Sequence, residues 1–286
     1  MKVLVTGVSG QLGFDVVREL GARGIEAKGV GLEDFSLTDY EAMRRFVESY
    51  CPEAVVHCAA YTAVDKAEEE AELCLAVNAA ATGELARLAK AIGAKFLYIS
   101  TDYVFPGTGE NFYKPEDEKA PCNVYGESKL LGEEAARKEI DELFIVRISW
   151  VFGENGKNFI KTMASLADRG ISPSVVSDQV GRLTFTADLA RGIIHLLTNE
   201  APYGVYNLSG EGPVMSWAQV AKRVFELCGR NPEDVTEVTT EEYFAGREAA
   251  PRPLSSTLDL SKIEATGFTP QDSSQRIDSY VASLRG

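Results

Sequence analysis

Long hydrophobic runs are missing from this chain of 286 residues. No apolar stretch reaches the roughly 18 residues that predict a membrane-spanning helix. The first residues, MKVLVTGVSGQLG, reach glycine and polar residues too early for a secretory signal peptide. We therefore expect a cytoplasmic protein without a membrane partner. Its 45% hydrophobic and 25% charged residues are typical of a globular chain with one large domain, or one large and one small domain.

Cysteine and histidine are also scarce. The five cysteines are odd in number, form no C-x-x-C pair and stand far apart, at residues 51, 58, 74, 122 and 228. Neither a disulfide framework nor a zinc site follows from this spacing. His57 lies in an apolar segment and is interpreted as a packed core histidine, whereas His195 lies in a helical one. We assign no metal site.

Positive charge is in deficit. The chain has 29 Lys and Arg residues against 43 Asp and Glu residues, which gives a formal net charge of -14. Such a charge disfavours nonspecific binding to nucleic acid or to an anionic membrane surface. An anionic small molecule would therefore need locally placed backbone amides or arginines.

Strand and helix patterns alternate through the first half. The segments typical of buried strands, rich in Val, Ile and aromatic residues, are 2–7, 25–32, 54–60, 95–101 and 143–153. The helical stretches between them are 11–23, 39–50, 69–92 and 123–139. This alternation predicts an α/β fold with a doubly wound parallel sheet that is covered by helices on both faces.

A glycine-rich segment joins the first strand to the first helix. TGVSGQLG (6–13) places Gly7, Gly10 and Gly13 in the spacing G-x-x-G-x-x-G. Glycines there allow a tight turn and let the backbone approach a pyrophosphate, whose charge sits over the N-terminal amides of the helix. In the first βα unit of an alternating sheet, this pattern favours a Rossmann-type dinucleotide site over a plain turn.

The regular alternation stops after residue 153. A helix, several short extended pieces, a second helix and another strand follow, and Ser216 can cap a further helix. We expect residues 1–153, completed by about residues 184–209, to form the dinucleotide-binding domain. Residues 154–183 and 210–286 are expected to form a smaller mixed α/β lobe that binds substrate.

Tyr125 and Lys129, in VYGESK (124–129), are four residues apart in a predicted helix. Side chains at this spacing lie side by side, so the ammonium could lower the pKa of the phenol. Taken alone, the pair is also compatible with a packed tyrosine beside a solvated lysine.

Several motifs together resemble one family. GVSGQLG, CAAYTAVDKAEEE, STDYVFPGTGE, PCNVYGESKLLGE, RISWVFGENGKNF, SDQVGRLT and RPLSSTLD occur in order along the chain. They are similar to segments of the dTDP-4-dehydrorhamnose reductases, which belong to the extended short-chain dehydrogenase/reductase superfamily. The resemblance spans nearly the whole chain.

The resemblance implies a catalytic set of Thr101, Tyr125 and Lys129. Tyr125 would protonate the oxygen of a ketone while a nicotinamide delivers hydride to its carbon. Lys129 would hold the ribose hydroxyls and favour the phenolate after proton transfer, and Thr101 would hydrogen-bond the carbonyl oxygen. In related 4,6-dehydratases the catalytic threonine is followed by Asp-Glu, whereas here Asp102 and Tyr103 follow, which suits simple ketone reduction. Asp102 is either a substrate contact or a strand-end residue that bonds nearby amides.

The resemblance also implies the cofactor contacts. Ser9, Gln11 and Leu12 would line the pyrophosphate, and Ala59, Ala60 and Tyr61 would pass along the adenosine and the nicotinamide ribose. Near the second strand the chain offers Glu33 and Asp34 but no arginine, and Asp34 is our candidate at the adenosine end. Members of the family often have Asp where this chain has Ser36. The family commonly uses NADPH, with NADH as the alternative.

A dTDP-sugar is the implied substrate. Besides Thr101, Asp102 and Tyr103, our candidate contacts are Val64, Trp150, Asn158, Phe159, Arg182 and Arg252. Trp150 either stacks on the sugar or belongs to the core. The two arginines are candidates for neutralising the diphosphate.

Three functions remain open at this point. The first is reduction of dTDP-4-dehydro-L-rhamnose to dTDP-L-rhamnose, and the second is reduction of another nucleotide-linked keto sugar. The third is a non-catalytic role, because the regulatory subunit of methionine adenosyltransferase resembles these reductases. A homodimer and a Mg²⁺ requirement, both known among similar reductases, are left open.

Overall fold

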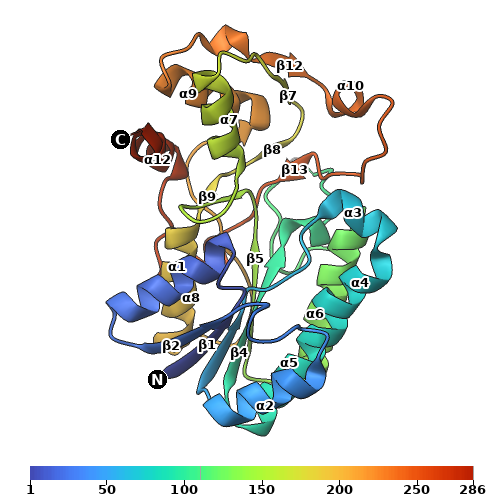
Figure 1. Cartoon of the computed structure of the whole chain (residues 1–286), viewed down its shortest axis with the longest axis vertical. Coiled ribbons are helices and arrows are strands. Elements are labelled where there is room, and N and C mark those ends of the chain that lie inside the picture. Colours follow the sequence, from blue (N-terminus) through green and yellow to red (C-terminus); the bar gives the residue numbers. More distant parts are fainter. Residues whose placement is uncertain (110, 286) are drawn as a thin grey trace.

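A parallel six-stranded sheet forms the centre of the larger part of the molecule (Figure 1). The computed structural model describes residues 1–109 and 111–285. The sheet has the order β10-β5-β4-β3-β1-β2 and all neighbouring strands are parallel. Its strands are β1 Lys2–Thr6, β2 Glu26–Val30, β3 Ala54–His57, β4 Lys95–Thr101, β5 Leu143–Ile148 and β10 Gly204–Asn207. The predicted fold class, a Rossmann-type parallel α/β sheet with a smaller mixed lobe, is confirmed.

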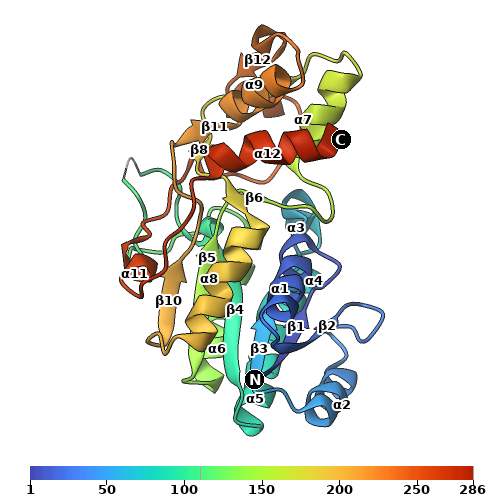
Figure 2. The same ribbon diagram turned by 90° about the vertical axis from the view of Figure 1, so that its left-hand side faces the viewer.

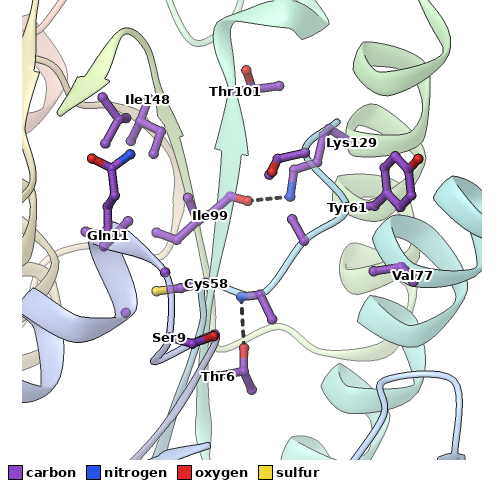
Figure 3. A pocket seen from close by; sticks show the side chains of 18 of the residues that line it. Thr6, Ser9, Gln11, Cys58, Tyr61, Val77, Ile99, Thr101, Lys129 and Ile148 are labelled. Carbon is purple, nitrogen blue, oxygen red and sulfur yellow. Dashed lines mark hydrogen bonds between the residues drawn. The ribbon is translucent and has the colours of Figure 1, made fainter. Parts of the chain in front are cut away.

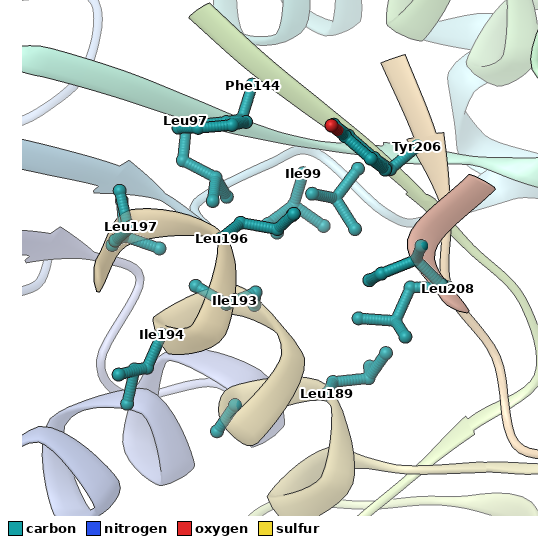
Figure 4. Packing of buried hydrophobic residues seen from close by; sticks show 14 of the residues in the cluster. Leu97, Ile99, Phe144, Leu189, Ile193, Ile194, Leu196, Leu197, Tyr206 and Leu208 are labelled. Carbon is teal, nitrogen blue, oxygen red and sulfur yellow. The ribbon is translucent and has the colours of Figure 1, made fainter. Parts of the chain in front are cut away.

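Helices cover both faces of the sheet. On one face lie α1 Gln11–Ala22 and α8 Thr186–Thr198, and on the other lie α2 Tyr40–Tyr50, α5 Ala81–Ala91 and α6 Val124–Glu139 (Figure 1). Figure 4 shows Leu189, Ile193 and Leu196 of α8 against Leu97 and Phe144 of the strands. The central strands β1, β3, β4 and β5 are buried on both sides, which explains their near-continuous apolar sequences, whereas only Val30 of the edge strand β2 is buried.

Helix starts follow from capping side chains. Asp39 Oδ1 accepts a hydrogen bond from the amide of Ala42 at 3.0 Å, and Asn123 Oδ1 accepts one from Gly126 at 2.7 Å. These contacts satisfy amides that have no partner inside the helix. They explain why α2 and α6 begin where the sequence predicts.

Two predicted elements differ most from the structure. The strand predicted over 143–153 ends at Ile148, because Trp150 adopts a left-handed φ of 48° and turns the chain out of the sheet. The helix predicted over 69–92 begins earlier and is interrupted. It consists of α3 Val64–Glu69, α4 Ala71–Leu75, the π-helical turn η1 Ala76–Ala80, and α5.

A smaller lobe packs over the carboxyl ends of the strands (Figure 2). It has its own apolar core between the helices α7 (Phe159–Asp168), α9 (Trp217–Leu227) and α12 (Ser273–Arg285). Ser216 caps α9 as predicted, through a capping box with Gln219. The remaining elements are β6 Val151–Phe152, α7 Phe159–Asp168, β7 Ser174–Val176, β8 Val180–Gly181, β9 Thr184–Phe185, β11 Met215–Ser216, α9 Trp217–Leu227, η3 Pro232–Asp234, β12 Thr236–Val238, α10 Thr240–Phe244, β13 Ser255–Ser256, α11 Ser261–Glu264 and α12 Ser273–Arg285, with the 3-10 turn η2 Asp102–Val104 after β4. Within the described residues, no helix is long and apolar enough to cross a membrane.

Candidate active site

A cleft of about 750 Å³ opens at the carboxyl ends of the parallel strands, where ligands of such sheets bind (Figure 3). Residues predicted to bind cofactor or substrate that line it are Gly7, Ser9, Gly10, Gln11, Leu12, Gly13, Ala59, Ala60, Tyr61, Val64, Thr101, Asp102, Tyr103, Tyr125, Lys129 and Trp150. The structure therefore brings the glycine segment and the Tyr-x-x-x-Lys pair to one site.

The glycine turn is held by backbone contacts. Gly7 has a φ of 73° and its amide donates to Val30 O at 2.9 Å. A Cβ on Gly13 would lie 2.3 Å from Gly7 O, so only glycine lets α1 pack against the turn. Gly10 is the N-cap of α1 and provides no side-chain cap. The first amides of this helix and its positive dipole end thus suit an anion such as a pyrophosphate.

Tyr61 is held by a residue that sequence reasoning missed. Asn78 lies in the π-helical turn η1, is buried, and bonds both the amide of Tyr61 at 2.8 Å and its carbonyl at 3.0 Å. Its Nδ2 also donates to Ser128 Oγ at 2.9 Å. A π-helical turn interrupting a longer helix often marks a functional site, but the sequence gives no periodic signal for it.

The two catalytic candidates on α6 lie in a water-poor environment. Lys129 is 2% exposed, and its Nζ donates to Ile99 O at 2.7 Å (Figure 3). The same Nζ lies 4.1 Å from the centre of the Tyr98 ring. Burial lowers the pKa of Lys129 to about 7. Burial also raises the pKa of Tyr125, and an interaction with Thr101 opposes the rise. The Tyr125 phenol is thus stabilised in its protonated form, rather than shifted toward phenolate by the lysine as the spacing suggested.

Thr101 and Asp102 line the same cleft as Tyr125 and Lys129. The Thr101 hydroxyl donates to Asp102 Oδ1 at 2.9 Å and accepts the amide of Tyr103 at 3.2 Å. The ring of Tyr103 meets Tyr125 edge to face at 5.5 Å. Asp102 is 4% exposed, and burial raises its pKa to about 6. Asp102 therefore combines local hydrogen bonds with a position at the cleft.

Trp150 both lines the cleft and packs in the lobe. Its ring stacks on Trp217 with centroids 3.7 Å apart, and Phe159 packs against Trp217 at 4.7 Å. Phe159 itself does not line the cleft. Asn158 also lies outside it: its Oδ1 caps α7 and its Nδ2 donates to Gln11 Oε1 at 3.2 Å.

The remaining charged candidates lie outside the cleft. Arg252 pairs with Asp65 at 2.7 Å, and the guanidinium of Arg182 lies 4.5 Å from the centre of the Phe112 ring. Asp34 accepts the amide of Gly31 at 2.9 Å instead of facing the cleft. Among the described residues, the cations that line the cleft are Lys129 and Lys157, and sequence reasoning missed Lys157.

An ion pair behind the site was also missed. Arg147 of β5 and Glu133 of α6 are fully buried and form two parallel hydrogen bonds at 2.8 and 2.7 Å. Glu133 stands four residues after Lys129, and this helical spacing could have indicated a role for Glu133 beside the lysine. Its partner comes from another element, so the sequence alone does not reveal the pair.

Metal ligands do not cluster in the described part of the chain, where no group of three His, Cys, Asp or Glu residues could hold an ion. His57 is packed between Thr6 and Thr82, and burial lowers its pKa to about 3. His195, on α8, forms a hydrogen bond with Thr266, which follows α11. Neither histidine lines the cleft.

The whole chain is similar to known proteins in sequence and in fold. The family model described as the RmlD substrate binding domain matches residues 1–285. A dTDP-4-dehydrorhamnose reductase of Streptomyces griseus is 39% identical over 272 residues, which is 93% of this chain and 88% of the relative. The spore coat polysaccharide biosynthesis protein SpsK of Bacillus subtilis is 38% identical over 280 residues, or 98% of this chain and 96% of the relative. A crystal structure of dTDP-4-dehydrorhamnose reductase from Bacillus anthracis in complex with NADP superposes with a TM-score of 0.91 at 35% identity, covering 99% of this chain and 100% of that chain.

Proposed function

Because the chain belongs to the dTDP-4-dehydrorhamnose reductase family of nicotinamide-dependent oxidoreductases, we propose that it reduces dTDP-4-dehydro-L-rhamnose to dTDP-L-rhamnose. NADPH is the proposed hydride donor, with NADH as the alternative. The observation that supports this best is the single cleft that joins an uncapped helix N-terminus at the glycine turn to the half-buried Tyr125 and the buried Lys129. The relative named for spore coat polysaccharide synthesis supports a role of the product in a surface polysaccharide.

The residues of the cleft fit a dinucleotide. The amides that begin α1 would hold the pyrophosphate, and Ala59 and Ala60 would let the riboses approach the ends of β1 and β3. When bound, the dihydronicotinamide supplies the hydride. Lys157 is the exposed cation of the cleft and would offset negative charge near the turn.

Tyr125 acts as the proton donor in this proposal. Loss of water raises the pKa of its phenol, so the phenol stays protonated until the ketone oxygen gains charge, and the proton then passes from Oη to that oxygen. Thr101 would hydrogen-bond the same oxygen, and the ammonium of Lys129 would stabilise the phenolate that remains. Asp102 is followed by Tyr103 rather than a glutamate, so the site offers no evident base for a dehydration.

The test is turnover by the purified chain. It would be mixed with enzymatically generated dTDP-4-dehydro-L-rhamnose, and loss of reduced-nicotinamide absorbance would be followed with NADPH and then with NADH. We expect oxidation coupled to dTDP-L-rhamnose, identified by NMR, and almost none with Tyr125→Phe. No oxidation despite intact dinucleotide binding would point to another nucleotide-linked keto sugar or to a non-catalytic role such as that of a regulatory subunit.

A further inference from the structure

Lys129 and Glu133 lie one turn apart on α6 and contact consecutive residues of β4. The Lys129 Nζ donates to Ile99 O at 2.7 Å, and Ser100 Oγ donates to Glu133 Oε1 at 2.6 Å. The next residue of this strand is Thr101, which lines the cleft. The two contacts therefore fix the catalytic turn of the helix against the strand that carries the third catalytic candidate.

Glu133 is itself held rigidly. Arg147 donates to both of its carboxylate oxygens, at 2.8 and 2.7 Å, and also to Pro115 O at 2.9 Å. Arg137 approaches the same carboxylate at 3.5 Å from the solvent side of α6. A bidentate arginine fixes the plane of a carboxylate. Burying such a pair rarely stabilises a fold compared with apolar residues, so the pair calls for another explanation.

Few charged groups face Lys129. The titratable groups around its ammonium come from its own helix and from three neighbouring elements, and they are Glu133, Tyr125, Cys58, Cys74, Tyr98 and His57. Burial raises the pKa of Cys58 to about 12 and also raises the pKa values of Cys74, Tyr98 and Tyr125, so these groups are neutral near pH 7. Burial also keeps His57 neutral, because it lowers its pKa to about 3. Among the described residues, Glu133 is thus the anion that faces this lysine.

We propose that Glu133 is a positioning residue of the reductase, which, held by Arg147 and Ser100, keeps Lys129 protonated and aligned beside Tyr125. This inference rests on the proposed function, in which Lys129 acts as an ammonium. Removal of water from around Lys129 opposes its charge and lowers its pKa, and the Glu133 carboxylate works in the opposite direction. A neutral lysine would neither stabilise the phenolate nor present three donors to the ribose.

The test is the pH dependence of Glu133→Gln. Without the carboxylate the pKa of Lys129 falls further, so the ammonium is lost at a lower pH. The alkaline limb of kcat/KM should therefore move down by about one pH unit, the scale of a single neighbouring charge. Activity relative to the native chain should recover as the pH is lowered. A purely structural defect would instead reduce activity by the same factor at every pH.

Two further variants guard this test against misfolding. Glu133→Gln leaves Arg147 buried without its partner, which is destabilising. The double variant Glu133→Gln with Arg147→Met removes both charges, and it should keep the shifted limb while regaining thermal stability. Glu134→Gln, at an exposed position of the same helix, is the matched control and should leave the limb in place.

Cofactor affinity provides a second readout that does not depend on the sugar. The pH at which NADPH binding weakens should shift in the same direction in both Glu133 variants. The inference would be overturned if the alkaline limb of kcat/KM and the pH dependence of NADPH binding stayed in place in both variants while the native chain reduced the keto sugar. The proposed function would then remain intact. A native chain that binds NADPH but reduces no keto sugar would instead contradict the proposed function.

Discussion

The two walls of the cleft differ in whether backbone or side chains shape them. The glycine-turn wall, residues 6–13, is shaped by backbone and by the lack of side chains, and a Cβ at Gly13 would lie 2.3 Å from Gly7 O. The α6 wall consists of polar side chains, the half-buried Tyr125 and the buried Lys129, whose pKa values are shifted by the loss of water. The first wall depends on close approach of backbone, and the second on burial and charge. Substitutions in the glycine-turn wall should therefore weaken cofactor binding, whereas substitutions in the α6 wall should lower kcat.

The largest effect is expected on the α6 wall. Tyr125→Phe removes the proposed proton donor but keeps the ring, so kcat should fall by about 10²–10⁴, the usual contribution of a positioned general acid. The dissociation constant of the cofactor, measured by fluorescence titration, should barely change. Tyr203→Phe, at an exposed position outside the cleft, is the control and should retain native kcat. Near-native turnover by Tyr125→Phe would rule out this mechanism.

A methyl group added to the glycine-turn wall should weaken cofactor binding rather than slow the chemical step. Gly13→Ala forces α1 away from Gly7 and is expected to weaken cofactor binding at least about tenfold and to destabilise the fold by about 1–3 kcal/mol. Gly21→Ala is the matched control in the same helix, because nothing beyond the backbone of the helix itself and the neighbouring residues lies within 4 Å of the added carbon. It should stabilise the fold by about 0.5–1 kcal/mol without changing cofactor affinity. Calorimetric titration of both variants makes the comparison, and equal affinities would show that the tight turn is not needed.

The smallest effect is expected outside both walls. Ser216→Ala removes the cap of α9 in the smaller lobe, and this should cost about 1 kcal/mol of stability in urea unfolding. Kinetic constants measured well below the unfolding transition should stay native. A changed KM for the sugar would mean that the start of α9 contributes to the substrate site, and the two-wall description would then be incomplete.

The sequence predicts the glycine-turn wall better than its surroundings. The alternation of buried strands and amphipathic helices predicts the parallel α/β sheet. Gly7, Gly10 and Gly13 are predictable because the tight turn needs residues without a side chain. The pairing of Tyr125 with Lys129 is also a local signal, since helical spacing alone places the two side chains side by side. Such signals depend on residues close in the chain, and they predicted the sheet and the centre of the cleft.

Contacts between distant residues were not predictable in the same way. Whether Arg252 faces a ligand or pairs with Asp65 depends on a segment 187 residues away, and the structure shows the pair. The Glu133 and Arg147 pair likewise joins two elements. The break at Trp150 arises from a left-handed residue that apolar periodicity does not signal. Each of these was decided by tertiary packing rather than by local pattern.

Isotope transfer tests the central claim most directly. The native chain would be supplied with dTDP-4-dehydro-L-rhamnose and with reduced cofactor that carries deuterium at its transferable position, and the product would be examined by NMR. Reduction at the two walls of this cleft predicts deuterium on C4 of the rhamnose product and loss of the C4 proton signal. Product that keeps a proton at C4, or cofactor that is never consumed, would contradict it.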